Sequence, residues 1–170
     1  MIVIVIVEGE RPRVLSDERI EQIVCTYSSC LYRFAVAYLK EHAESQDVVQ
    51  DVFIQLLDKQ PVFGSPEQEK AWLYRVTANK CKNLLKSSRY KKEMRLTEEH
   101  NKIAATEQAD MDIVDYVLKL EEKYRAPIHL YYYEGYSIKE IAGILNQNPS
   151  TISTHLDRAR QQLKEMMSEA

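Results

Sequence analysis

The C-terminal part of the chain takes its fold from residues 135–164, which read GYSIKEIAGILNQNPSTISTHLDRARQQLK. Ser137, followed three residues later by Glu140, has the form of a capping box, which begins a helix. Asn146 tolerates the left-handed conformation of a tight turn, and Pro149 suits the first position of the following helix. The stretch therefore predicts two helices joined by a short turn.

The second helix of this pair has one apolar and one polar face. Its apolar residues, which recur at helical spacing, are Ile152, Leu156, Ala159 and Leu163. The residues that we expect on its outward face include Thr151, Ser153, Thr154, Asp157 and Arg158. In a helix-turn-helix such a face enters the major groove of DNA, whereas in an ordinary helical hairpin it only meets water. The periodicity by itself is consistent with both.

Three longer amphipathic helices are expected between residues 16 and 87. Ser16 caps the first helix, whose apolar face continues to Tyr38. The second helix is expected at about residues 45–58 and the third at about residues 68–87, with a loop that contains proline and glycine between them. Because each helix has an apolar stripe, the three together predict a domain with one core.

Four segments follow from these patterns. We expect an N-terminal tail at 1–15, a helical domain at 16–87, a flexible linker at 88–109 and a second helical domain, the helix-turn-helix, at 110–170. The linker is assigned because its residues are mostly polar and poor in aromatic side chains. The expected fold class is therefore all-α, with two small helical domains.

The N-terminal tail contains an apolar run, Met1 to Val7, which is far shorter than the roughly 18 apolar residues that suggest a membrane span. The run also lacks the basic start and the small-residue cleavage site of a secretory signal. We therefore expect no membrane insertion and a cytoplasmic protein. The run itself predicts no function.

The charges alternate along the chain. The formal net charge is −3, which by itself argues against a nucleic-acid binder. However, residues 70–95 hold nine basic residues against one acid, whereas residues 41–58 hold five acids and no Lys or Arg. Residues 96–122 then hold eight acids against two lysines. Such an alternation is typical of a protein that meets both a protein partner and a polyanion.

Catalysis and metal binding have little support in the sequence. Cys25, Cys30 and Cys81 show no metal-ligand spacing, and the four histidines are scattered. An enzyme that uses Cys25, Cys30 or His129 remains an alternative, but no nucleophile is clustered with a base and no Gly-rich phosphate loop is present. We therefore expect no enzymatic activity, no metal, no cofactor and reduced thiols.

Three segments of the chain resemble, in order, the motifs of the extracytoplasmic-function sigma factors of bacterial RNA polymerase. Residues 46–53, QDVVQDVF, resemble the polymerase-binding helix of that family. Residues 71–79, AWLYRVTAN, resemble the start of its helix for the minus-ten promoter element, and residues 135–164 resemble its module for the minus-thirty-five element. The ordered set is much more specific than one helix-turn-helix. It implies a sigma factor that binds core polymerase and directs promoter recognition and transcription initiation.

The resemblance also implies roles for individual residues. The residues that would contact the clamp helices of the largest polymerase subunit are Asp47, Gln50 and Asp51. The third helix would present to promoter DNA the residues Arg75, Asn79, Lys80, Asn83 and Lys86. The last helix would contribute Ser153, Thr154, Asp157 and Arg158, with Thr151 on the same outward side. Relatives are commonly held inactive by an anti-sigma factor, so we expect such a partner here.

Several assignments have two interpretations. Arg158 can span the acceptors of a guanine or clamp a phosphate, and Asp157 can accept from a cytosine or orient Arg158. Trp72 lies on the apolar side of its helix, which favours a core role over base stacking. The alternative function is a stand-alone helix-turn-helix regulator that binds DNA without polymerase. That alternative leaves residues 46–53 and 71–79 unexplained.

Overall fold

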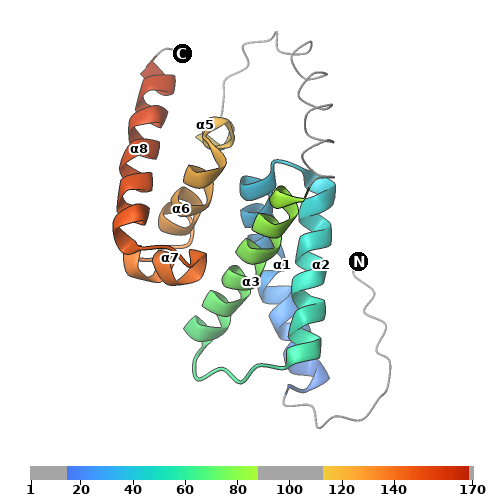
Figure 1. The fold of residues 1–170 in the computed structure, drawn as a ribbon. Coiled ribbons are helices and arrows are strands. Elements are labelled where there is room, and N and C mark those ends of the chain that lie inside the picture. The colour runs from blue at the N-terminus through green and yellow to red at the C-terminus, as the bar shows by residue number, and fades with distance from the viewer. Residues whose placement is uncertain (1–14, 88–112, 169–170) are drawn as a thin grey trace.

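The computed structural model describes residues 15–87 and 113–168 (Figure 1). Within these two ranges the chain is helical and contains no strand, which confirms the expected all-α class. The helices are α1 (Asp17–Leu39), α2 (His42–Lys59), α3 (Pro66–Lys86), α5 (Ile113–Lys119), α6 (Glu122–Tyr132), α7 (Ile138–Leu145) and α8 (Pro149–Ser168).

Side-chain caps explain where α1 and α3 begin. The Ser16 hydroxyl accepts a hydrogen bond from the Arg19 amide at 3.2 Å, and the Ser65 hydroxyl accepts one from the Gln68 amide at 3.3 Å. Because Pro66 fits the first helical position after this cap, α3 begins two residues before the predicted start. The helix α2 likewise begins three residues earlier than predicted.

The helices α1, α2 and α3 enclose one apolar core. Phe34, Leu56 and Leu73 each come from a different helix and are fully buried. Burying a side chain of this size stabilises the fold by about 1.5–3 kcal/mol relative to leaving it exposed. An ion pair also crosses the bundle, because Arg19 Nη2 lies 2.6 Å from the nearly buried carboxylate of Glu69. These contacts hold the first three helices together as a unit.

The predicted helix-turn-helix is formed by α7, a turn and α8. Ser137 and Glu140 make both hydrogen bonds of the capping box at the start of α7. The turn passes through Asn146, whose φ of 50° lies in the left-handed region, and α8 begins at Pro149. These three local predictions are confirmed.

The helix before this motif, α6, contains Pro127 in its interior and continues past it to Tyr132. Gly135 then adopts a φ of 73°, a conformation that glycine reaches without the steric penalty of a side chain. The chain turns here from α6 toward α7, as expected for a glycine that ends a helix.

Two groups of helices lie side by side, and we call them the first helical domain (α1–α3) and the second helical domain (α5–α8) (Figure 1). The helix α6 packs against α1, and α7 packs against α3. The domain boundaries given above remain predictions, since the linker predicted at 88–109 and all but Leu15 of the tail predicted at 1–15 lie outside the described residues.

Candidate functional site

The polar residues predicted on α2 line a groove between α2 and α3. Asp47, Gln50 and Asp51 contribute from α2, and Lys80 and Asn83 contribute from α3. The Lys80 Nζ lies 3.2 Å from the Asp51 carboxylate. The structure thus brings the three residues predicted to bind polymerase together with two residues that were predicted to bind DNA.

A further residue extends the same face of α2. Asp47, Gln50, Asp51 and Ile54 recur at spacings of three and four residues, which places them on one side of the helix. The Ile54 side chain is 54% exposed, whereas Val52 on the other side is fully buried. Ile54 was not identified from the sequence. An isoleucine at helical spacing from the polar residues of one helix face is a pattern that could have identified it.

The other α3 residues predicted to meet DNA form an exposed face. Arg75, Asn79 and Lys86 are exposed, and they share one side of the helix with Asn83, because the spacings are three and four residues. Lys80 is only partly exposed, because it turns toward Asp51. These residues therefore form one exposed face of α3, with Lys80 at its border with the groove.

The loop before α3 exposes an apolar side chain. Val62 is 80% exposed, and its neighbour Phe63 packs edge-on against Trp72, with ring centroids 5.8 Å apart. Trp72 is partly buried and also packs against the apolar core. This position agrees with the core role that its place on the apolar side of α3 favoured. Val62 was not identified from the sequence.

The helix α8 presents the polar face predicted for it. The residues of that face, all at least partly exposed, are Thr151, Ser153, Thr154, Asp157 and Arg158. The Asp157 carboxylate lies 2.7 Å from Arg160 Nη1, so the structure pairs Asp157 with Arg160 and not with Arg158, the partner considered from the sequence. Arg158 lies on the same helix, and its positively charged side chain is exposed.

His155 faces the interior of the second helical domain. Its ring packs edge-on against Tyr124, with centroids 5.5 Å apart. Burial, together with the nearby charges of Lys123 and Arg158, lowers the pKa of His155 and favours the neutral imidazole. The positive charge on this part of α8 therefore comes from its arginines.

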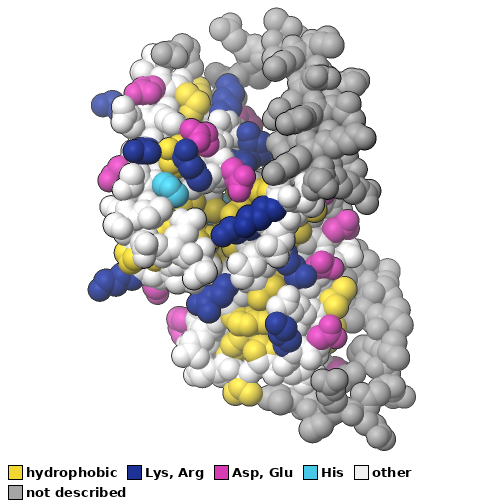
Figure 2. All heavy atoms as spheres, in the orientation of Figure 1, with side chains coloured by type: hydrophobic (Ala, Val, Ile, Leu, Met, Phe, Trp, Pro, Cys, Tyr) yellow, Lys and Arg dark blue, Asp and Glu magenta, His cyan; other side chains and the backbone are white. Residues whose placement is uncertain are grey.

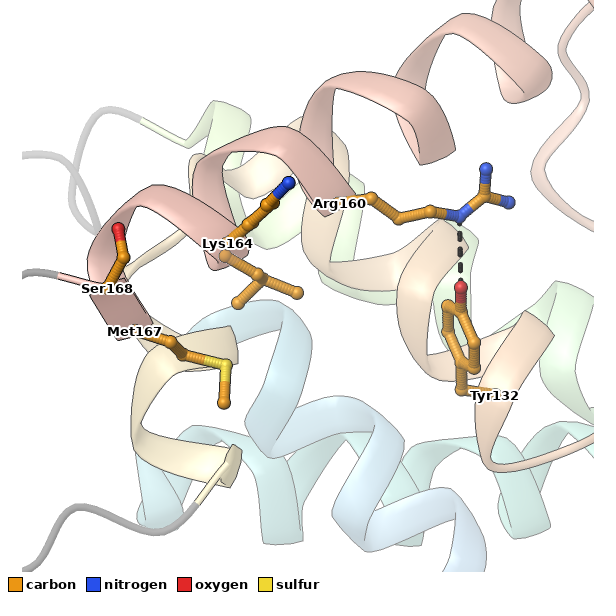
Figure 3. Close-up of a pocket in the computed structure, with 6 residues that line it drawn as sticks. Tyr132, Arg160, Lys164, Met167 and Ser168 are labelled. Carbon is orange, nitrogen blue, oxygen red and sulfur yellow. Dashed lines mark hydrogen bonds between the residues drawn. The ribbon is translucent and has the colours of Figure 1, made fainter.

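A second, shallow groove lies where α8 meets the end of α6 (Figure 3). It is lined by Tyr132, Arg160, Leu163, Lys164, Met167 and Ser168. The Arg160 Nε donates a hydrogen bond to the Tyr132 hydroxyl at 2.9 Å, as the dashed line in Figure 3 shows. Because Arg160 belongs to α8 and Tyr132 to α6, this hydrogen bond joins the two helices, whereas the pair of Arg160 with Asp157 lies within α8.

Charges of both signs are interspersed over one face of the molecule. On the face shown in Figure 2, Lys and Arg side chains lie among Asp and Glu side chains over both helical domains. The formal net charge of the whole chain is −3. This face differs from the contiguous basic patch that is typical of proteins that bind DNA by themselves.

Metal ligands and reactive thiols do not gather into a site in the described part of the chain. In residues 15–87 and 113–168, no group of three or more His, Cys, Asp or Glu side chains is placed to hold a metal ion. Burial raises the pKa of the Cys81 thiol to about 12, which keeps it protonated at neutral pH. None of the described helices is both long enough and apolar enough to span a membrane.

Two family models match the chain. The model for sigma-70 region 2 matches residues 23–90, and the model for sigma-70 region 4 matches residues 110–163. The first match contains the groove between α2 and α3, and the second contains the helix-turn-helix.

Curated relatives cover most of the chain. The RNA polymerase sigma factor SigV of Bacillus subtilis is 27% identical over 133 residues, which are 75% of this chain and 78% of SigV. The ECF RNA polymerase sigma factor SigM of the same organism is 25% identical over 154 residues, which are 85% of this chain and 93% of SigM. A third relative, the ECF sigma factor SigL of Mycobacterium tuberculosis, is also 25% identical, over 84% of this chain and 85% of SigL.

Two solved structures share the fold. The sigma factor RpoE of Bartonella quintana, solved with the anti-sigma factor NepR, superposes with a TM-score of 0.65 at 24% identity, over 87% of this chain and 96% of RpoE. CnrH, solved with the cytosolic domain of CnrY, superposes with a TM-score of 0.64 at 23% identity, over 91% of this chain and 90% of CnrH. The similarity extends over both helical domains.

The fold and the site define an all-helical, two-domain transcription protein whose second domain is a helix-turn-helix. The chain belongs to the extracytoplasmic-function subfamily of the RNA polymerase sigma factors. A stand-alone regulator is not favoured, because that alternative accounts for the second domain and leaves the match to sigma-70 region 2 unexplained.

Proposed function

We propose that the groove between α2 and α3 binds the clamp helices of core RNA polymerase, while α3 and α8 contact two promoter elements. The observation that carries this proposal is the groove, in which Asp47, Gln50 and Asp51 lie together on one side. These polar side chains are exposed, whereas the residues on the opposite side of the same helix are buried. They are therefore available to a partner.

Lys80 has a role in this groove that differs from the one predicted from the sequence. Its side chain is 26% exposed, whereas that of its partner Asp51 is 61% exposed. An exposed carboxylate held by one lysine can still accept hydrogen bonds from a second cation, so Lys80 orients Asp51 toward polymerase. Ile54 adds an apolar contact beside these polar groups, which is the composition of an interface core with a polar rim.

The exposed faces of α3 and α8 are proposed to contact DNA in two different ways. Arg75, Asn79, Asn83 and Lys86 face the same side of α3 and are suited to phosphates and to bases of a melting duplex. On α8, Thr154 and Arg158 lie on the outward face of a helix-turn-helix, from which side chains reach base edges in the major groove.

Four further features complete the proposal. The domains correspond to residues 16–87 and 110–170, and the protein acts in the cytoplasm, together with polymerase. It has no catalytic activity of its own. Because RpoE of Bartonella quintana was solved with the anti-sigma factor NepR, we expect an anti-sigma partner for this chain as well.

Run-off transcription tests the function directly. Core polymerase is incubated with genomic fragments in the presence and absence of the protein, and the transcripts are mapped to their start sites. We expect start sites that require the protein and that share two upstream elements. Tight, sequence-specific binding of the isolated chain to duplex DNA, without stimulation of transcription, would instead support the stand-alone regulator.

A further inference from the structure

Three side chains form a line of contacts from α6 to the outward face of α8. The Tyr132 hydroxyl accepts a hydrogen bond from Arg160 Nε at 2.9 Å, and Arg160 Nη1 donates one to Asp157 Oδ1 at 2.7 Å. We call these three residues the α6–α8 triad. The function proposed above names Thr154 and Arg158 on α8 and makes no use of the triad.

The guanidinium of Arg160 is held by two tyrosines of α6. Besides its hydrogen bond to Tyr132, which Figure 3 shows, it lies over the ring of Tyr131, with Cζ 5.8 Å from the ring centroid. The rings of Tyr131 and Tyr132 pack edge-on with centroids 5.0 Å apart, and Tyr131 packs against the apolar core. Because a guanidinium is planar, these contacts set the direction of its Nη1 donor.

The carboxylate of Asp157 lies on the outward face of α8. Its side chain is 66% exposed, and Asp157 follows Thr154 by three residues, which places the two on neighbouring positions of one face. Arg160 contacts only one oxygen of this carboxylate, Oδ1. A carboxylate has about four acceptor sites on its two oxygens, so Asp157 can accept a further hydrogen bond through Oδ2.

A carboxylate on a helix that faces DNA is repelled by phosphates, but the charge of Arg160 offsets that of Asp157. An ionised carboxylate only accepts hydrogen bonds, and the donors in the major groove are the amino groups of cytosine and adenine. The adenine amino group has an acceptor on each side, N7 and thymine O4. The cytosine amino group has an acceptor on one side only, so cytosine suits Asp157 better.

We propose that Asp157 recognises the amino group of a cytosine in the minus-thirty-five element, and that Arg160 and Tyr132 are positioning residues that orient its carboxylate. This inference deepens the proposed function and rests on it, since it requires the outward face of α8 to enter the major groove. Tyr132 belongs to α6 and acts only through Arg160. Base preference at one position therefore depends on a hydroxyl outside α8.

The opposite arrangement would have Arg160 contact a phosphate, with Asp157 orienting Arg160. In that case, weakening the triad lowers affinity for all promoters and leaves base preference unchanged, because a phosphate contact carries no direct sequence information. If Asp157 recognises cytosine, weakening the triad changes the preference at one base pair. The two arrangements therefore predict different results for the same variants.

Three variants change the triad at successive positions. Tyr132→Phe removes only the hydroxyl, and Arg160→Lys keeps the charge but lacks the planar fork that contacts both partners. Asp157→Asn, with its Oδ1 still on Arg160, replaces Oδ2 by an amide donor that faces the cytosine amino group. The matched control is Tyr133→Phe, since the neighbouring Tyr133 is 50% exposed and its ring stacks on His129, with centroids 5.1 Å apart. Circular dichroism verifies that each variant is folded.

Transcription by core polymerase with each full-length protein gives the readout, on promoters varied one base at a time across the minus-thirty-five element. We expect wild type and Tyr133→Phe to prefer cytosine at one base pair. At that base pair, Asp157→Asn should lose this preference by about fivefold or more, and Tyr132→Phe and Arg160→Lys by about twofold or more. Preference elsewhere and the salt dependence of promoter binding should be unchanged in Tyr132→Phe and Arg160→Lys, because neither changes a charge.

Three results would overturn the inference. If Tyr132→Phe and Arg160→Lys lowered transcription from all promoters equally, Arg160 would be a phosphate contact. If only Asp157→Asn changed the preference, the positioning role of Arg160 and Tyr132 would be wrong. If the wild type produced no protein-dependent start sites, the proposed function would fail together with this inference, whereas protein-dependent start sites with unchanged preference in all variants would overturn this inference alone.

Discussion

The Lys80 Nζ lies 3.2 Å from the Asp51 carboxylate, although the two residues are 29 positions apart in the sequence. The pair connects the helix that was expected to bind polymerase with the helix that was expected to bind DNA. A basic residue on the helix that we propose binds DNA thus lines the groove that we propose binds polymerase, so the two proposed surfaces share a border on α3.

Lys80→Ala is expected to weaken polymerase binding with little effect on stability. The Lys80–Asp51 pair is partly exposed, and pairs of this kind contribute about 0–1 kcal/mol to folding. Lys86→Ala serves as the control, since Lys86 is exposed on α3 outside the groove. We expect Lys86→Ala to leave polymerase affinity unchanged and to reduce the salt dependence of promoter binding by about one phosphate contact. If Lys80→Ala and Lys86→Ala had equal effects on polymerase affinity and on the salt dependence of promoter binding, the different roles assigned to the two lysines would be wrong.

Gln50→Ala combined with Asp51→Ala is expected to reduce the affinity for core polymerase about tenfold, which corresponds to about 1.4 kcal/mol. Helicity and thermal stability should remain nearly unchanged, because exposed substitutions usually change the free energy of unfolding by less than about 0.5 kcal/mol. Asp58→Ala is the matched control, since it removes an exposed acid from α2 outside the groove. The assignment is wrong if the double variant and the control bind polymerase equally well.

Ile54→Ala is expected to weaken polymerase binding without destabilising the chain. The side chain is 54% exposed, so its truncation creates no cavity in the free protein, whereas burial in a complex would remove it from water. Val62→Ala provides a comparison, because Val62 is also exposed but lies in the loop before α3. Calorimetric titration with core polymerase compares the affinities of Ile54→Ala and Val62→Ala. A loss of thermal stability in Ile54→Ala would instead indicate a structural role.

Arg158→Ala distinguishes base recognition from a phosphate contact. Loss of a bidentate contact to guanine should cost about 1–3 kcal/mol and relax the preference at one base pair only. Loss of a phosphate contact should weaken all promoters equally and reduce the salt slope by about one. We expect the first result, because Arg158 lies on the outward face of α8, one turn beyond Thr154. Promoters varied one base at a time across the minus-thirty-five element provide the measurement. If base preference and the amount of transcript were both unchanged, the Arg158 side chain would contact only solvent.

The ion pair between Lys70 on α3 and Glu134, with Nζ and carboxylate 2.9 Å apart, should make stability depend on pH. Burial alone would raise the pKa of Glu134, but its interactions with His129, Lys70 and Tyr74 outweigh burial and lower that pKa to about 2. Because the folded pKa lies below the ordinary 4.5, the ionised carboxylate stabilises the native chain above pH 4.5, and this stabilisation is lost as the pH falls toward 2.

Urea unfolding of wild type and Glu134→Gln between pH 7 and pH 3 measures this effect. The wild type should exceed the variant in free energy of unfolding at pH 7, and the difference should shrink as the pH falls below 4.5. Other carboxylates titrate equally in both chains and cancel in the difference. A difference that stays constant across this range would show that the pKa of Glu134 is not lowered in the folded chain.

Local features of the chain could be predicted from the sequence alone. The cap at Ser16, the capping box of Ser137 and Glu140, and the left-handed turn at Asn146 depend on residues within about four positions of one another. The periodicity of apolar residues likewise showed which side of α2 and α8 faces the core. The order of three motifs then identified the family, and the matches to sigma-70 regions 2 and 4 confirmed it.

The partners of the charged side chains were decided only by the tertiary structure. Sequence periodicity placed Asp51 and Lys80 on polar faces, but their contact depends on how α2 and α3 are rotated against each other. The same holds for Lys70 and Glu134, which meet because α6 and α7 pack on the first helical domain. The pattern of apolar and polar residues along a helix indicates which side of the helix packs against another helix. Which residues that side contacts depends on how the large buried side chains pack together.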